Sequence, residues 1–140
     1  MRLDPTFRWA IYSALAVLVV TGAAWLVADA LKSGDGGEVW QSIAANLLMI
    51  HGGASMAMLL LLGALFPLHM RRGWLSNRNR LSGSVIATSN ALLIATAFAL
   101  YYSGSDALRA WTSYAHIGVG LALPILAAVH ILLGRRSRLV

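Results

Sequence analysis

The sequence predicts an all-α integral membrane protein, a four-helix bundle whose helices run alternately up and down. Of its 140 residues, 59% are hydrophobic and only 11% are charged, which leaves too little polar surface to cover a water-soluble core. The apolar residues form four long runs, each able to cross roughly 30 Å of hydrocarbon as a helix. Membrane β-strands would instead alternate apolar and polar residues, so we expect helices rather than a barrel.

We expect one transmembrane domain over residues 1–140, with spans at about 9–31, 41–68, 83–102 and 112–134. The first run ends at Asp29 and Lys32, and Pro67 should bend or end the second. The first run exceeds the usual length of a signal-peptide core. We therefore favour a span there over a cleavable signal.

The charge distribution predicts the orientation. The chain has a net charge of +6, and its basic residues concentrate at the two termini and in the second connection. The arginines in these places are Arg2, Arg8, Arg71, Arg72, Arg78, Arg80, Arg135, Arg136 and Arg138. The first and third connections hold only Lys32 and Arg109 as basic residues. By the positive-inside rule both termini are cytoplasmic, and the expected partner of these arginines is a membrane surface rather than nucleic acid.

The chain contains no cysteine, which excludes a disulfide, a thiolate metal site and a covalently attached haem. Its four histidines all belong to the second and fourth spans: His51, His69, His116 and His130. The first two are separated by 18 positions and the last two by 14, and in an α-helix either spacing brings the side chains back to about the same face.

Each of these two helices thus carries one imidazole toward each membrane surface, about 27 Å apart on the second span and about 21 Å apart on the fourth. The two spans run in the same direction. His51 is therefore expected level with His116 on the outer side, and His69 level with His130 on the inner side. The sequence predicts two pairs of imidazoles.

Four imidazoles with no thiolate and no membrane carboxylate suit iron held axially by two nitrogens. Small residues beside the histidines would let a flat macrocycle enter between helices: Gly52, Gly53, Gly118, Gly120 and Ala127. We expect the other ring N–H of each imidazole to bond to a helix carbonyl one turn earlier, for example His51 to Leu47.

Several short segments carry a resemblance to a known family: His51-Gly52-Gly53, Leu68-His69-Met70-Arg71, the stretch NRNRLSG at 77–83, Tyr101-Tyr102, and His116-Ile117-Gly118 with His130. The chain resembles, over roughly residues 9–134, the small four-helix di-haem b-type cytochromes of the bacterial inner membrane. These are similar in plan to the cytochrome b subunits of formate dehydrogenases and nickel-iron hydrogenases. In several relatives the first helix supplies a haem ligand, whereas the first span here has no histidine.

The resemblance implies two non-covalent haem b groups, the outer held by His51 and His116 and the inner by His69 and His130. It implies electron transfer in a respiratory chain, between the quinone pool and a periplasmic cytochrome or redox subunit. Iron with two axial histidines has no position open for oxygen. Quinone oxidoreductase activity as part of a complex is a further expectation, with Tyr101, Tyr102, Tyr114 and Arg109 as candidate quinone contacts at the outer end.

Two alternatives from other classes remain open on the residues alone. The same histidines could serve a membrane carrier of zinc or copper, although their spacing is too wide for one tetrahedral site on one helix. They could also be helix-to-helix hydrogen-bond donors in a non-redox structural subunit of a membrane complex. For His69, which lies beyond Pro67 and beside Arg71, packing near the end of the span is a further alternative to iron ligation.

Overall fold

The computed structural model describes residues 4–34, 36–77 and 79–136, and in this part of the chain every regular element is helical. In chain order the elements are α1 (Pro5–Leu31), α2 (Gly37–Leu65), the π-helical turn η1 (Phe66–Met70), α3 (Arg71–Leu75), α4 (Arg80–Tyr102) and α5 (Asp106–Arg136). The prediction of an all-α chain is confirmed. Helices α1, α2, α4 and α5 are each long and apolar enough to cross a membrane.

The helices begin earlier than the apolar runs, because polar residues start them. Asp4 caps α1, its carboxylate accepting from the backbone N–H of Thr6 at 2.9 Å and of Phe7 at 3.3 Å. Helix α5 begins at Asp106, six positions before the expected 112, and its first turn carries an acidic residue as the helix dipole favours. Hydropathy marks the part of a helix that suits hydrocarbon, and the helix itself continues into polar sequence.

The second helix changes geometry where Pro67 occurs. Its α-helical part ends at Leu65, and Phe66–Met70 form a π-helical turn. Proline has no N–H to donate and its ring crowds the carbonyl four residues earlier, so a wider turn accommodates it. The expectation that Pro67 bends or ends this span is met by the π turn, and the short helix α3 follows.

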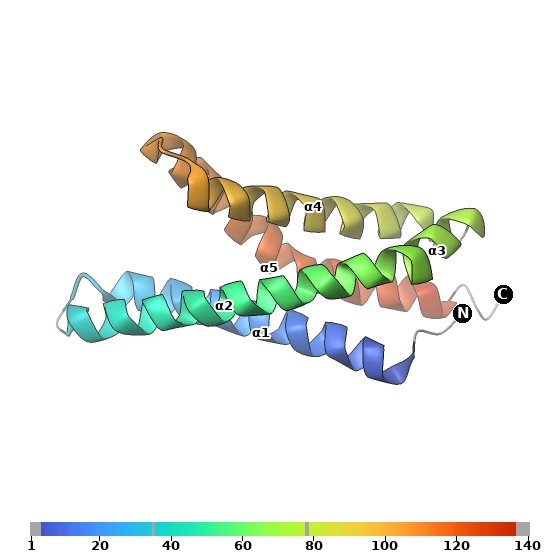
Figure 1. Cartoon of the computed structure of the whole chain (residues 1–140), viewed down its shortest axis with the longest axis horizontal. Helices are drawn as coiled ribbons and strands as arrows, with labels where there is room; N and C mark the ends of the chain where they lie inside the picture. Colours follow the sequence, from blue (N-terminus) through green and yellow to red (C-terminus); the bar gives the residue numbers. More distant parts are fainter. Residues whose placement is uncertain (1–3, 35, 78, 137–140) are drawn as a thin grey trace. The chain divides into compact units, whose positions relative to one another are not determined.

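The chain divides into two units, Met1–His69 and Met70–Val140. In the first unit α1 packs against α2, and in the second α4 packs against α5, so each unit is a helical hairpin (Figure 1). A tight connection joins α1 to α2. Gly36 has a φ of 79°, and a Cβ on Gly37 would lie 2.6 Å from the carbonyl oxygen of Lys32, so this turn requires glycine at both positions.

A seven-residue repeat lines the contact within the second hairpin. On α4 the repeat consists of Ser82, Ser89 and Thr96, and on α5 it consists of His116, Leu123 and His130. Ser89 and Leu123, at the centre, are both buried. Hydrophobic or small residues recurring every seven positions keep one face of a helix turned toward an antiparallel neighbour. This seam sets which α4 residue meets which α5 residue.

The first hairpin has the same kind of seam. Thr21 on α1 contacts His51 on α2, and the buried Ala28 and Ala44 lie seven positions from them, in the direction of the turn. Met58, seven positions beyond His51 on the other side, is also buried. The seam therefore extends along α2 from the turn past the histidine.

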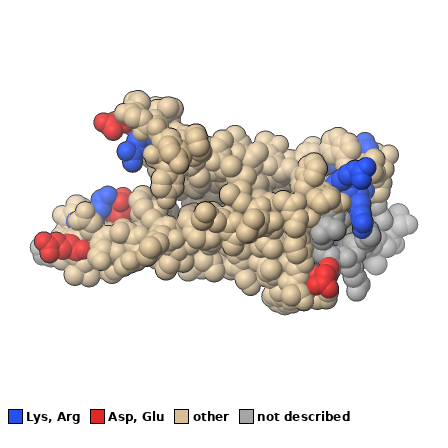
Figure 2. Space-filling view, in the orientation of Figure 1, with Lys and Arg blue, Asp and Glu red and all other residues tan. Residues whose placement is uncertain are grey.

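Outside the seams the helices expose large apolar side chains. Leu60 is 78% exposed, Leu81 is 81% exposed and Val20 is 65% exposed. On the face drawn in Figure 2, charged side chains lie near the helix ends and the stretch between them carries none. Such surfaces are unfavourable in water and suit contact with lipid chains.

Candidate functional site

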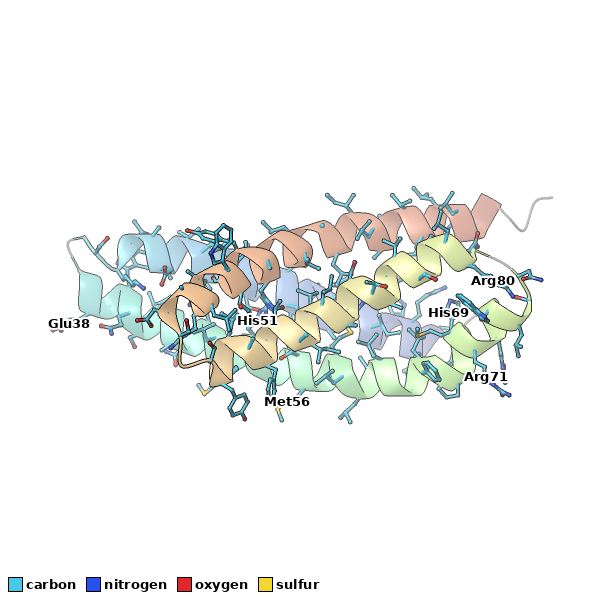
Figure 3. The ribbon with its side chains drawn as sticks, turned by 90° about the horizontal axis from the view of Figure 1, so that it is seen from above. Glu38, His51, Met56, His69, Arg71 and Arg80 are labelled. Atoms are coloured by element: carbon cyan, nitrogen blue, oxygen red, sulfur yellow. The ribbon has the colours of Figure 1, made fainter. Side chains whose placement is uncertain are left out.

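His51 lies well inside α2 and is turned toward α1. Figure 3 shows it on the side of α2 opposite to Met56, and Met56 is 71% exposed. Nδ1 of His51 is 3.0 Å from Oγ1 of Thr21, and the ring also bonds to the backbone of Leu18. The imidazole is half-buried, and α1 holds it in one orientation.

His116 and His130 repeat this arrangement on α5. Nδ1 of His116 lies 2.8 Å from Oγ1 of Thr96, and Nδ1 of His130 lies 2.9 Å from Oγ of Ser82. The two histidines and the two hydroxyl residues are each separated by 14 positions, so one antiparallel register produces both contacts. The predicted common face of His116 and His130 is consistent with the unbroken helix α5, although Pro124 lies between them.

The hydroxyl groups indicate which ring nitrogen carries the proton. A hydroxyl has one hydrogen to donate. Thr21 Oγ1 donates to the carbonyl oxygen of Val17 at 2.6 Å, and Thr96 Oγ1 donates to that of Leu92 at 2.7 Å. With its hydrogen on the carbonyl, each oxygen is an acceptor toward the imidazole, and this arrangement requires the ring hydrogen to be on Nδ1. In a neutral imidazole Nε2 is then the nitrogen with the lone pair, the form in which histidine binds metals through Nε2.

Ser82 follows the same scheme with a longer bond. Its Oγ lies 3.2 Å from the carbonyl oxygen of Asn79 and 2.9 Å from Nδ1 of His130. Three imidazoles in two separate hairpins thus present the same nitrogen to a hydroxyl group.

Two of these rings lie beside a glycine of the neighbouring helix. A Cβ on Gly22, next to Thr21, would lie 3.4 Å from Cε1 of His51. A Cβ on Gly83, next to Ser82, would lie 3.8 Å from Cε1 of His130. In both hairpins, a hydroxyl residue followed by glycine on the neighbouring helix receives the imidazole. Larger side chains at these glycines would push the ring away from its hydroxyl.

His69 is placed differently. It lies in the π turn η1, at the end of the hairpin away from Glu38 (Figure 3). Residues of a π turn advance by less than the 100° of an α-helix, because each turn contains an extra residue. His51 and His69 would share a face only if the helix were α-helical throughout, and its α-helical part ends at Leu65. The His69 position is therefore rotated about the helix axis by less than an α-helix would give, and it does not return fully to the face that carries His51.

The hydroxyl residues Thr21, Ser82 and Thr96 were missed by reasoning from the sequence. We expected helix carbonyls one turn earlier, such as that of Leu47, to accept the ring N–H, and the structure brings hydroxyls of the neighbouring helix to Nδ1. One signal was available, since Ser82 and Thr96 have the same 14-residue spacing as His116 and His130. For Thr21 no such signal exists, because no hydroxyl residue lies 18 positions before it to match the spacing of His51 and His69.

An apolar groove runs along the second hairpin beside Ser82. It has a volume of about 390 Å³ and is lined by Asn79, Arg80, Leu81, Ser82, Val85, Leu126, Val129 and Leu133. Arg80 is fixed at its edge, since Nε and Nη2 donate to the carbonyl oxygen of Trp74 at 2.9 and 2.7 Å and the guanidinium lies 5.0 Å from the Trp74 ring centre. The groove is thus apolar with polar groups at one end.

The tyrosines proposed as quinone contacts lie at the other end of this hairpin. Tyr101, Tyr102 and Tyr114 are 80%, 75% and 71% exposed, and the ring of Tyr102 packs on Phe98 with centres 4.5 Å apart. Arg109 lies in the first turns of α5 and is also exposed. The exposed tyrosines thus lie near the ends of α4 and α5, where aromatic residues of membrane proteins commonly meet the lipid headgroups.

Within the described ranges, no group of three or more His, Asp or Glu side chains is gathered closely enough to hold a bare metal ion. Comparisons of the chain with models of protein families, with curated protein sequences and with solved structures give no match.

Proposed function

We propose that this chain is a multi-pass protein of the bacterial inner membrane that transfers electrons through two bis-histidine haem b groups. The observation that carries the proposal is the recurrence of one contact. His51, His116 and His130 each direct Nδ1 to a hydroxyl of the neighbouring helix, which makes Nε2 the coordinating nitrogen.

The membrane part of the proposal rests on the exposed apolar surfaces and on the four helices of sufficient length. An imidazole inside hydrocarbon is costly and is rarely kept without a function. Lipid would cover the exposed apolar faces of the helices. The arginines of the second connection and of the two termini place these parts of the chain on the cytoplasmic side. The proposed fold is then an up-down-up-down bundle assembled from the two hairpins.

The residues of the chain fit a haem in their donor chemistry. From the positions of the histidines in their spans we expect His51 and His116 near the outer membrane surface and His69 and His130 near the inner one. We therefore assign the first pair to the outer haem and the second pair to the inner haem. When bound, each haem would supply a one-electron centre. The protein would hold each iron by imidazole nitrogens, orient the rings through the hydroxyls, and exclude water with its apolar helices.

The proposed partners of the chain in electron transfer are a quinone and a redox protein at the outer face. A quinone is an apolar ring that carries two hydrogen-bond acceptors, and sites for such molecules are apolar with a few polar groups. The groove beside Ser82 has this composition, and Ser82 also contacts His130. We propose this groove, in place of the tyrosines at the opposite end of α4 and α5, as the quinone site.

The test is the haem content of the protein purified in detergent. We expect two haems per chain, with sharp reduced-minus-oxidised bands. The variant His116→Ala should retain one haem, because it removes one axial ligand of one iron. Leu121→Ala, an exposed position on the same helix, serves as the matched control and should retain both.

A colourless protein that contains zinc would contradict the proposal and support a metal carrier. A colourless protein without metal would support a structural subunit. Two haems in His116→Ala would show that His116 is not an axial ligand and would overturn the assignment.

A further inference from the structure

We propose that the hydroxyls of Thr21, Thr96 and Ser82 are positioning residues that hold the Nδ1-protonated tautomer of His51, His116 and His130 and lower the midpoint potential of the iron bound by these rings. The proposed tautomer involves only the protein's own contacts and does not require a bound haem. The statement about the potential rests on the proposed function.

The direction of each hydrogen bond depends on where the hydroxyl hydrogen lies. Thr96 Oγ1 is 2.7 Å from the carbonyl oxygen of Leu92 and 3.1 Å from that of Leu93, and carbonyl oxygens only accept. In the proposal the single hydroxyl hydrogen lies on the α4 backbone. With the hydrogen there, the imidazole of His116, at 2.8 Å, supplies the hydrogen of the contact between them.

A hydroxyl with the same kind of neighbours is found in the first hairpin. Thr21 Oγ1 is 2.6 Å from the carbonyl oxygen of Val17 and 3.3 Å from that of Leu18, and Nδ1 of His51 lies 3.0 Å away. Thr21 is only 6% exposed, so water does not compete for its oxygen. The two threonine contacts thus form independently, in two hairpins that share no residue.

A hydroxyl that donates to a carbonyl becomes a stronger acceptor, because successive hydrogen bonds polarise one another. A stronger acceptor at Nδ1–H makes the imidazole a more basic ligand. A more basic ligand stabilises ferric over ferrous iron, so the midpoint potential of that haem falls. The Ser82 contact should act in the same direction and less strongly, since its bond to the Asn79 carbonyl is 3.2 Å long.

The seam of the second hairpin contains its own control. Ser89 lies midway between Ser82 and Thr96 in the same seven-residue row, and its hydroxyl donates to the carbonyl oxygen of Val85 at 2.9 Å. Its level on α5 is occupied by Leu123 instead of a histidine. If the hydroxyls served only helix packing, removing any one of the three would change haem binding and the midpoint potential to the same extent. If the hydroxyls act through an imidazole, only their removal at Ser82 and Thr96 changes these two properties.

The experiment compares Thr96→Val, Thr96→Ser and Ser89→Ala in the full-length protein, by potentiometric titration of the haem bands and by haem retention. Thr96→Val keeps the shape of the side chain and removes the hydroxyl. We expect it to shift one midpoint to a more positive potential and to weaken haem binding roughly 10- to 100-fold, as loss of such a ligand partner commonly does. Thr96→Ser should restore both properties, and Ser89→Ala should change neither.

A second readout does not depend on haem. In protein labelled with ¹⁵N at histidine and prepared without haem, the ring nitrogen shifts should show the Nδ1–H tautomer for His116, and Thr96→Val should abolish this preference. An Nε2–H tautomer in the parent protein would overturn the proposal. Two bound haems with equal potentials in Thr96→Val and the parent would overturn the part about the potential while leaving the proposed function intact. A protein that binds no haem would overturn the proposed function, and the tautomer would still be tested.

Discussion

Nδ1 of His116 lies 2.8 Å from Oγ1 of Thr96, and 14 positions along both helices His130 meets Ser82 through the same ring nitrogen. Because α4 and α5 are antiparallel, a single register produces both contacts. Any change that slid one helix along the other would break both together. The hairpin is therefore built to present two imidazoles in the same way at two heights.

The inner haem should depend equally on His69 and His130. We expect His69→Ala and His130→Ala each to leave one haem per chain, and the double variant also to leave one, because all three remove ligands of the same iron. Pyridine haemochrome assays on purified protein measure this stoichiometry. Leu60→Ala, at a position 78% exposed on α2, should keep two haems. A His69→Ala protein with two haems would remove His69 from the ligand set.

Gly22 should tolerate one added methyl group and no more. A Cβ there would lie 3.4 Å from Cε1 of His51, which is ordinary contact. The longer side chain of Gly22→Leu would displace the ring from Thr21. We expect Gly22→Ala to keep both haems and Gly22→Leu to lose one, measured as the haem-to-protein ratio. Gly63→Leu is the control, because nothing lies within 4 Å of its added Cβ. Equal haem contents in the two leucine variants would contradict the role of Gly22.

The distribution of arginines predicts where the connections lie. Alkaline phosphatase inserted at Gly104 should be active, because the third connection is expected outside. A green fluorescent protein fused after Val140 should fluoresce, because this fold forms in the cytoplasm and not after export through the general secretory route. A fluorescent insertion at Gly104 with a dark C-terminal fusion would mean that the orientation is reversed.

Filling the groove of the second hairpin should slow reduction by quinol. Val85 lines the groove, and Val85→Trp would occupy part of its volume of about 390 Å³. We expect a lower rate of haem reduction by decylubiquinol in stopped-flow measurements, with haem content unchanged. Val20→Trp, an exposed position on α1, should leave the rate unaltered. Slower reduction in Tyr101→Phe, with a normal rate in Val85→Trp, would place the quinone at the other end.

The helices themselves could be predicted well from the sequence, because their apolar runs are long and continuous. Their ends could not, since Asp4 and Asp106 start α1 and α5 through capping and dipole effects that hydropathy does not measure. The π turn at Phe66–Met70 was also beyond prediction. Pro67 signals a disturbance of the helix, and several local geometries can satisfy it.

The amino-acid sequence alone determined the all-helical class, the four apolar runs and the placement of every histidine inside or directly after two of them, because these properties depend on composition and on spacing within single segments. Only the tertiary structure decided that Thr21, Thr96 and Ser82 meet the rings, and through Nδ1. That choice depends on how two helices align along their shared seam and on where each hydroxyl sends its one hydrogen, and neither is a property of a segment by itself.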